Sequence, residues 1–223
     1  MIFWSRLSPN AVSILRCSVL GILIWVSPTL LPGIYGQPAY SVVLEDFQNL
    51  DTDGFPKGWD GSRSKVTARE AYSVFQEDGG AFLKGKGANQ RVYTKSIQWN
   101  PKTHPILRWR WRLVSVPENA DFIAGVFANL DTDFLLIPVS TKYVWSGTKS
   151  QGSITDGGMF GAAEVVLRSG SQPIGEWVTE EVNAYEDFKA IHQHEPADEA
   201  WGISLQSGSG VEIDFGALEI GVR

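Results

Sequence analysis

The feature that most constrains the fold of this chain is the regular spacing of its turn-forming residues. After residue 40, clusters of Gly, Pro, Asn, Asp and Ser recur roughly every ten residues, and the segments between them are short and rich in Val, Ile, Phe, Trp and Tyr. Helical periodicity is nearly absent. This pattern predicts an all-β fold, and the number of strands favours two stacked antiparallel sheets, a β-sandwich of jelly-roll type, over a closed barrel.

The turn signals divide the chain into thirteen expected strands and one helix. The strands are predicted at residues 41–47, 72–76, 81–84, 91–97, 106–114, 123–129, 134–139, 142–145, 163–168, 176–182, 200–206, 211–215 and 217–222. A short helix is predicted at residues 183–192, because Asn183 can cap its start and Tyr185, Phe188 and Ile191 fall on one side.

The first 36 residues have the order of a secretory signal peptide. Two cations, Arg6 and Arg16, precede an apolar run at residues 19–26, and a proline follows at Pro28. Cleavage after Gly36 would place the mature protein in the periplasm or outside the cell. An uncleaved anchor is the alternative interpretation, because apolar residues continue beyond Pro28.

No repeat, charge block or low-complexity linker divides residues 40–223, so we expect a single domain. Cys17, the only cysteine, lies in the predicted leader, which leaves the mature chain without disulfide or thiolate chemistry. The formal net charge is −6, and losing Arg6 and Arg16 with the leader leaves 17 Lys and Arg against 25 Asp and Glu, or −8. Such a chain is a poor partner for a nucleic acid or for an anionic membrane.

A strand with two very different faces is predicted in "HPILRWRWRLVSVP", residues 104–117. Side chains alternate across a strand, so the residues of this segment divide into two sets. One face carries Leu107, Trp109, Trp111 and Leu113, and the other carries Arg108, Arg110 and Arg112. We interpret the tryptophan face as core.

The three arginines need anions if their face is half-buried. Arginines two residues apart repel one another by roughly 0.6 kcal/mol in water and by about 2.5 kcal/mol at an effective dielectric constant near 20. The anions can be internal, from Glu180, Glu212 or Asp214, or they can belong to an acidic ligand such as a sugar carboxylate or sulfate. The sequence leaves both interpretations open.

Three further residues are candidates for ligand binding. Glu180 falls on the same side of its expected strand as two valines, where a carboxylate is costly to desolvate unless a cation meets it. Tyr143 and Trp145 in "TKYVWSG" stand beside a glycine at a strand end, where their rings could stack on sugars. With Arg108, Arg110 and Arg112, these residues form the predicted binding site.

Two clusters have the residue types of metal sites, but neither has a complete pattern. "AIHQHEP" offers His192, His194 and Glu195 without an obvious further ligand for zinc. "NLDTD" occurs twice and supplies four aspartates, Asp51, Asp53, Asp131 and Asp133. Turn formation explains these aspartates, and a structural calcium is the alternative. No cofactor is predicted.

The order of several motifs resembles a bacterial family known only as domain-of-unknown-function family 3047. The motifs are "GFPKGW", "LRWRWRL", the Ala-Asp at 120–121, "KYVWSG", "VVLRSG" and "GEWVTEEVNAYEDF", followed by a closing strand rich in Gly and Ile. The resemblance extends over residues 45–221 and implies an exported sandwich without an established activity. The chain departs from the family pattern in "ADFIAGVF" and "LQSGSG", which lack acidic residues found there.

Three hypotheses for function follow from these observations. In the first, a non-catalytic β-sandwich binds a glycan or another polar ligand in a groove lined by Arg110, Tyr143, Trp145 and Glu180. In the second, a polysaccharide lyase or hydrolase uses Tyr143 or His192 as a base and an arginine to neutralise a uronate. In the third, the protein is a structural part of the cell envelope. The sequence determines neither the ligand nor the oligomeric state.

Overall fold

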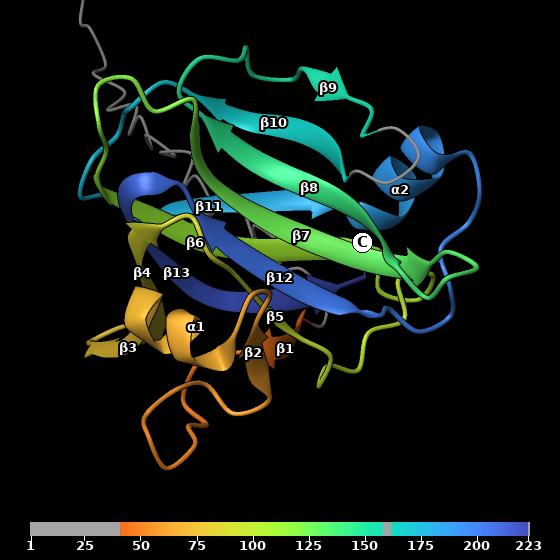
Figure 1. Cartoon of the computed structure of the whole chain (residues 1–223). Coiled ribbons are helices and arrows are strands. Elements are labelled where there is room, and N and C mark those ends of the chain that lie inside the picture. Colours follow the sequence, from red (N-terminus) through yellow and green to blue (C-terminus); the bar gives the residue numbers. More distant parts are fainter. Residues whose placement is uncertain (1–40, 158–161, 223) are drawn as a thin grey trace, which may run out of the picture. The chain divides into compact units, whose positions relative to one another are not determined.

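The computed structural model describes residues 41–157 and 162–222, which form two stacked β-sheets and two helices (Figure 1). The prediction of an all-β sandwich is therefore confirmed. The predicted leader, residues 1–36, lies outside the described residues, so its cleavage stays a prediction.

The first sheet has the tryptophan-arginine segment near its middle. Its strand order is β11 (Val178–Asn183), β6 (Ile106–Ser115), β13 (Ser209–Gly221), β4 (Gly80–Ala88) and β3 (Tyr72–Glu77), and β1 (Ser41–Glu45) also pairs with β13.

The second sheet lies opposite the first. Its strand order is β2 (Trp59–Gly61), β5 (Arg91–Thr94), β12 (Gly202–Ser207), β7 (Phe122–Thr132), β8 (Pro138–Ser146), β10 (Ala163–Ser169) and β9 (Ile154–Thr155).

The two helices lie beside the sandwich (Figure 1). Helix α2 (Ala184–His192) confirms the predicted helix, and the side chain of Asn183 caps it by accepting a hydrogen bond from the Glu186 amide at 3.0 Å. Helix α1 (Lys65–Ala71) was not predicted; Ser64 caps it, and its short apolar face buries only two alanines. No helix among the described residues is long and apolar enough to span a bilayer.

Aromatic rings from both sheets meet in the core. Trp109 and Trp111 of β6 are at most 1% exposed, as the alternation predicts. The ring centroid of Trp109 lies 5.7 Å from that of Tyr143, and the ring centroid of Trp111 lies 5.6 Å from that of Trp145. Tyr143 and Trp145 both belong to β8 of the opposite sheet. The tryptophan face of β6 therefore holds the two sheets together by burying large apolar rings.

Two details of the second sheet differ from the predictions. Strands β8 and β10 pair in parallel, because the intervening strand β9 lies on the far side of β10 and runs antiparallel to it, so the chain direction reverses twice between β8 and β10. Residues 134–137, predicted as the start of a strand, instead form the loop between β7 and β8, and β8 begins at Pro138. The Asp133 carboxylate accepts hydrogen bonds from the amides of Leu135 and Ile137, which closes this turn.

Candidate ligand-binding groove

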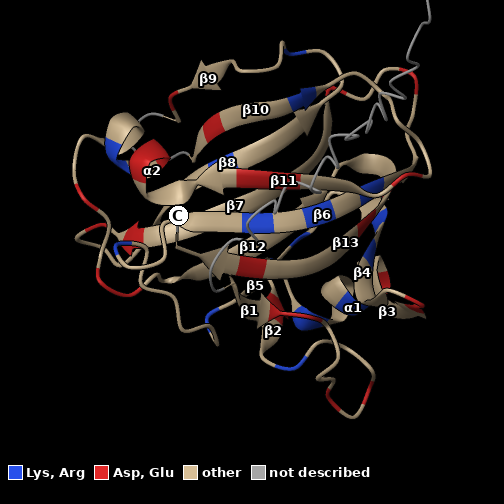
Figure 2. Ribbon diagram, turned by 180° about the vertical axis from the view of Figure 1, so that it is seen from behind, with Lys and Arg blue, Asp and Glu red and all other residues tan. Residues whose placement is uncertain are grey.

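The three strand arginines lie on the outer face of the first sheet, as predicted, and two of them are paired with carboxylates. Arg108 donates to Glu181 on β11 at 2.9 Å, and Arg112 donates to Asp214 on β13 at 2.9 Å and also pairs with Glu77. Figure 2 shows the cationic strand β6 between acidic positions on β11 and β13. These two arginines are therefore neutralised by the protein itself.

Arg110 is held differently. Its guanidinium donates to the Gly79 carbonyl at 3.2 Å and lies 4.4 Å from the centre of the Trp177 ring, whose centre is also 4.5 Å from the Arg112 guanidinium. Gly216 leaves room for this side chain, since a Cβ there would lie 2.5 Å from its Cγ. Cation–π contacts thus occupy the region that we predicted to bind a ligand.

The prediction that Tyr143 and Trp145 bind a ligand is corrected by their burial. Both side chains are 0% exposed, because alternation along β8 points them at the tryptophans of β6. Burial and the neighbouring Asp187 hold the pKa of the Tyr143 phenol well above its usual value of 10, and its hydroxyl donates to that carboxylate at 3.0 Å. Tyr143 is accordingly a core residue and not a base facing a substrate.

Glu180 meets a cation, but not one of the strand arginines. Its carboxylate, only 12% exposed, pairs with Arg168 on β10 and accepts a hydrogen bond from the Trp111 indole at 3.0 Å. The pair closes the sandwich where β11 and β10 approach each other. The predicted groove of Arg110, Tyr143, Trp145 and Glu180 does not form, because these residues lie in three separate places: the outer face, the core and the sandwich edge.

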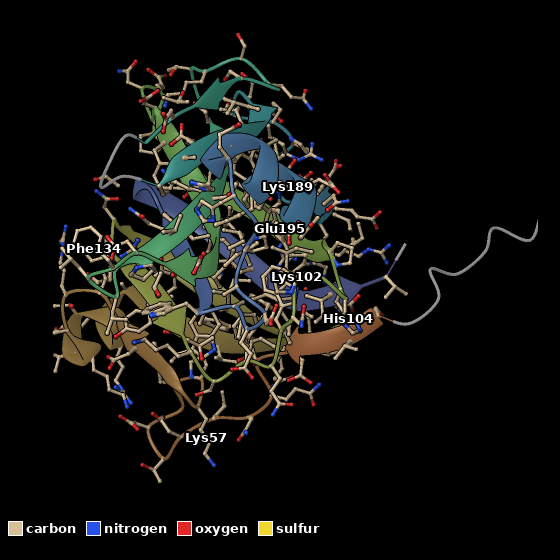
Figure 3. The ribbon with its side chains drawn as sticks, turned by 90° about the vertical axis from the view of Figure 1, so that its right-hand side faces the viewer. Lys57, Lys102, His104, Phe134, Lys189 and Glu195 are labelled. Atoms are coloured by element: carbon tan, nitrogen blue, oxygen red, sulfur yellow. The ribbon has the colours of Figure 1, made fainter. Side chains whose placement is uncertain are left out.

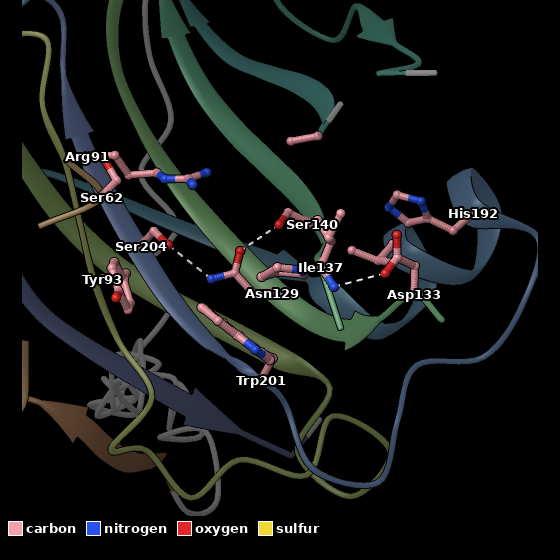
Figure 4. Close-up of a pocket in the computed structure, with 13 residues that line it drawn as sticks. Ser62, Arg91, Tyr93, Asn129, Asp133, Ile137, Ser140, His192, Trp201 and Ser204 are labelled. Carbon is pink, nitrogen blue, oxygen red and sulfur yellow. Dashed lines mark hydrogen bonds between the residues drawn. The ribbon is translucent and has the colours of Figure 1, made fainter. Parts of the chain in front are cut away.

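A different groove, of about 420 Å³, lies on the outer face of the second sheet (Figure 4). Strands β5, β12, β7 and β8 form its floor, and the loop between β7 and β8 and the end of α2 form one of its ends. Its lining includes Arg91, Tyr93, Asn129, Ser140, His192, Trp201 and Ser204.

A chain of buried polar side chains crosses the floor of the groove. Ser140 on β8 donates to the side-chain oxygen of Asn129 on β7 at 2.6 Å, and the Asn129 amide donates to Ser204 on β12 at 3.0 Å. All three are at most 6% exposed. These two hydrogen bonds fix the orientation of the three side chains in the floor of the groove.

Two aromatic rings stand beside this polar floor. Tyr93 and Trp201 are half-buried, with ring centroids 5.8 Å apart and planes inclined by 34°. The amine of Lys95 lies 4.1 Å from the centre of the Trp201 ring. The backbone of Gly202 passes so close to the Thr94 carbonyl that a Cβ would lie 2.2 Å from its oxygen, which fixes Trp201 at the start of β12.

The two ends of the groove differ in charge (Figure 4). Arg91 lies at one end, and Asp133 and His192 lie at the other. Burial and the neighbouring His194 lower the pKa of His192, so its imidazole is neutral at pH 7. The Nε2 atom of this ring is 3.3 Å from the Thr141 hydroxyl.

Three of the residues considered for metal binding, Asp51, Asp53 and Glu195, pair with cations instead, and His194 lies 3.6 Å from Asp131. Glu195 accepts from Tyr185 and pairs with Lys189 and Lys102, a cluster visible in Figure 3. Asp51 and Asp53 both pair with Arg69. Residues 41–157 and 162–222 contain no group of three or more His, Cys, Asp or Glu arranged to hold a metal ion.

The sequence analysis did not predict the groove, because its lining residues come from separate strands and form no recognisable motif. In "RVYT" Arg91 and Tyr93 share the face opposite Val92, and this alternation was a usable signal. Trp201 had no such signal: in the strand predicted at 200–206 it shares a side with Ile203 and Leu205, which are core residues. Because β12 begins only at Gly202, Trp201 escapes that alternation.

The family resemblance is supported by a direct comparison. Residues 136–209 match the profile of the family described as "Protein of unknown function (DUF3047)". This match supports membership of the DUF3047 family. The matched part of the chain includes β8, α2 and β12, and with them one side of the groove. None of the curated proteins matches the chain.

Solved structures similar to this chain include an adhesin domain and a xylan-binding domain. The K1 cleaved adhesin domain of Lys-gingipain from Porphyromonas gingivalis W83 is 12% identical with a TM-score of 0.43, over 82% of this chain and 99% of that chain. The CBM22-1 xylan-binding domain of Xyn10C from Paenibacillus barcinonensis is 14% identical with a TM-score of 0.37, over 83% and 94%. Similarities this low carry no argument about function.

Proposed function

We propose that the protein binds a carbohydrate, without catalysis, in the groove on the outer face of the second sheet. The observation that carries this proposal is the combination of the half-buried rings of Tyr93 and Trp201 with the hydrogen-bonded floor of Asn129, Ser140 and Ser204. Sugars present apolar C–H faces together with rows of hydroxyls. Aromatic rings beside fixed polar groups match both properties.

The size of the groove and the rigidity of its floor fit this proposal. A volume of about 420 Å³ lies within the range of small-molecule sites, roughly 300–1,000 Å³. The floor belongs to four hydrogen-bonded strands, so its polar groups are held in place before a ligand arrives. Preorganised groups lose little conformational entropy on binding.

The test compares two half-buried tryptophans on opposite sheets. Trp201→Ala removes a ring from the groove, whereas Trp177→Ala removes a ring from the arginine face of the first sheet. In affinity electrophoresis against a panel of soluble polysaccharides, we expect Trp201→Ala to weaken binding by tenfold or more, about 1.4 kcal/mol or more. Trp177→Ala should bind as the unchanged protein does.

The contrary result is equally clear. Equal binding by the Trp201→Ala variant and the unchanged protein would place the ligand elsewhere. No retardation on any member of the panel would remove the carbohydrate proposal and favour a structural role in the cell envelope.

A second candidate function is polysaccharide cleavage, and one observation favours it. His192 lines the groove as a neutral imidazole and could accept a proton from a bound sugar. Incubating the protein with the same panel and assaying for new unsaturated or reducing ends separates the two functions. Binding without product supports the first candidate, and product that is lost with His192→Ala would establish the second.

A further inference from the structure

In the part of the chain that the structure describes, the arginine at one end of the groove lacks the hydrogen-bond acceptor that the arginines on the faces of the first sheet have, including Arg110 with the Gly79 carbonyl. Arg69, Arg108, Arg112 and Arg168 each pair with a carboxylate. Within the described residues the guanidinium of Arg91 makes no hydrogen bond and no ion pair. The guanidinium instead lies 5.2 Å from the centre of the Phe127 ring, a cation–π contact.

This cation is half-buried, which makes the absence of an anion costly. Burial lowers the pKa of the Arg91 guanidinium below its usual value, which means that the surroundings disfavour its charged form. Gln206 pairs with Arg91 across β12 and β5, but its amide donates to Asn89 at 2.7 Å. The donors of the guanidinium fork are therefore free to meet an anion in the groove.

Among residues 41–157 and 162–222, no carboxylate forms an ion pair with Arg91. Asp133, the carboxylate that lines the groove, lies at the opposite end and accepts the amides of its own loop (Figure 4). Residues 1–40 and 158–161 contain no Asp or Glu at all. The guanidinium of Arg91 is therefore open to an anion from a bound molecule.

The position of Arg91 relative to the rings specifies where that charge would sit. Arg91 and Tyr93 lie two residues apart on β5 and on the same face, about 7 Å along the strand. A sugar ring stacked on Tyr93 or Trp201 would hold a substituent within reach of the fork. A planar carboxylate can accept two parallel hydrogen bonds from this fork.

We infer that Arg91 forms an anion subsite and that the ligand is an acidic sugar, a uronate, whose carboxylate meets the guanidinium. This inference rests on the proposed carbohydrate-binding function and adds the class of sugar. It also fixes the orientation of the ligand, because Asp133 would repel a carboxylate at the other end of the groove.

The test uses ligands that differ only in charge. The probes are oligogalacturonate and the same oligosaccharide with its carboxyl groups reduced to alcohols, an oligoalginate pair prepared in the same way, and a sulfated form of the reduced oligosaccharide. Binding to the full chain is measured by calorimetry for the unchanged protein, Arg91→Gln, Arg91→Lys and the control Arg108→Gln on the opposite sheet. Thermal unfolding of each variant confirms that it folds.

We expect a uronate probe to bind the unchanged protein at least tenfold more tightly than its reduced counterpart. Arg91→Gln should reduce the ratio of the two affinities to about one, and Arg91→Lys should retain part of the preference because it keeps the charge without the fork. Arg108→Gln should change neither affinity.

The outcomes separate this inference from the proposed function. If reduced and charged probes bind equally, or if Arg91→Gln keeps the preference, the anion subsite is wrong although carbohydrate binding stands. If sulfated oligosaccharides bind through Arg91 and uronates do not, the carboxylate assignment is overturned. If no oligosaccharide of any charge binds, the proposed function fails and the inference falls with it.

Discussion

Neighbouring carboxylates on one strand have different surroundings. Glu180 on β11 is 12% exposed and is held by Arg168 and the Trp111 indole, whereas Glu181 is 51% exposed and pairs with Arg108. Removing the anion from a mostly buried pair leaves a cation and an indole N–H without their acceptor. Removing it from an exposed pair leaves groups that water can solvate.

We therefore expect Glu180→Gln to lower the free energy of unfolding by about 1–3 kcal/mol, and its control Glu181→Gln to lower it by less than about 1 kcal/mol. Urea unfolding followed by tryptophan fluorescence measures both. Equal losses in the two variants would contradict the role assigned to the Glu180 carboxylate at the sandwich edge.

At this scale the sequence predicted which residues are buried better than which are functional. The two faces of β6 followed from alternation, because burying Trp109 and Trp111 leaves the arginines no other side. The same rule puts Tyr143 and Trp145 on one face of β8, but it does not say whether that face is core or surface. We predicted a ligand role for Tyr143 and Trp145 because a glycine follows them at the end of the strand. A glycine in that position also ends strands whose side chains are buried, which is the case here.

The loop between β7 and β8 shows how one element departs from its sequence pattern. Residues 134–137 are apolar, and such a run predicts a buried strand, yet Phe134 is 90% exposed at the loop tip (Figure 3). Asp133 closes the turn through two backbone amides, and Leu136 takes a φ of 61°. Local hydrogen bonds here outweigh the apolar pattern.

The conformation of Leu136 gives a prediction about this loop. A left-handed φ costs an L-residue with a side chain roughly 1–2 kcal/mol, and glycine avoids that cost. Leu136→Gly should therefore leave the free energy of unfolding unchanged or raise it by up to about 1 kcal/mol. The control Leu135→Gly, at an ordinary φ, should lower it by about 0.5–1 kcal/mol. Chemical denaturation tests both, and a larger loss for Leu136→Gly would exclude the strained turn.

At the scale of the whole molecule, strand alternation predicted a sandwich but not its connections. The parallel pairing of β8 with β10 depends on the path of the chain through β9, and no periodicity encodes that path. The groove depends on strand order as well, since Arg91, Asn129 and Trp201 come together only when β5, β12 and β7 are neighbours. A site assembled from four strands is therefore hidden from any single segment of sequence.

Tyr143 connects three parts of the molecule. Its ring packs against Trp109 of the first sheet, it belongs to β8 of the second, and its hydroxyl donates to Asp187 of helix α2 at 3.0 Å. Burial raises the pKa of the half-buried Asp187 carboxyl above its usual 3.8, and the Tyr143 hydrogen bond opposes that rise. The phenol thus lowers the cost of keeping the ionised carboxylate in the folded protein.

Tyr143→Phe keeps the ring and removes only the hydroxyl, so it should raise the pKa of Asp187 further. When folding raises the pKa of a carboxyl group, the protein loses stability as the pH rises from the unfolded-state pKa of that group through its folded-state pKa. The deficit of the variant should therefore be small near pH 4 and reach about 1–3 kcal/mol at pH 7. Urea unfolding across this range measures it, and in an Asp187→Asn background the deficit should no longer change with pH. A deficit that is constant from pH 4 to pH 7 in the unchanged background would show that the hydroxyl does not act through the Asp187 carboxylate.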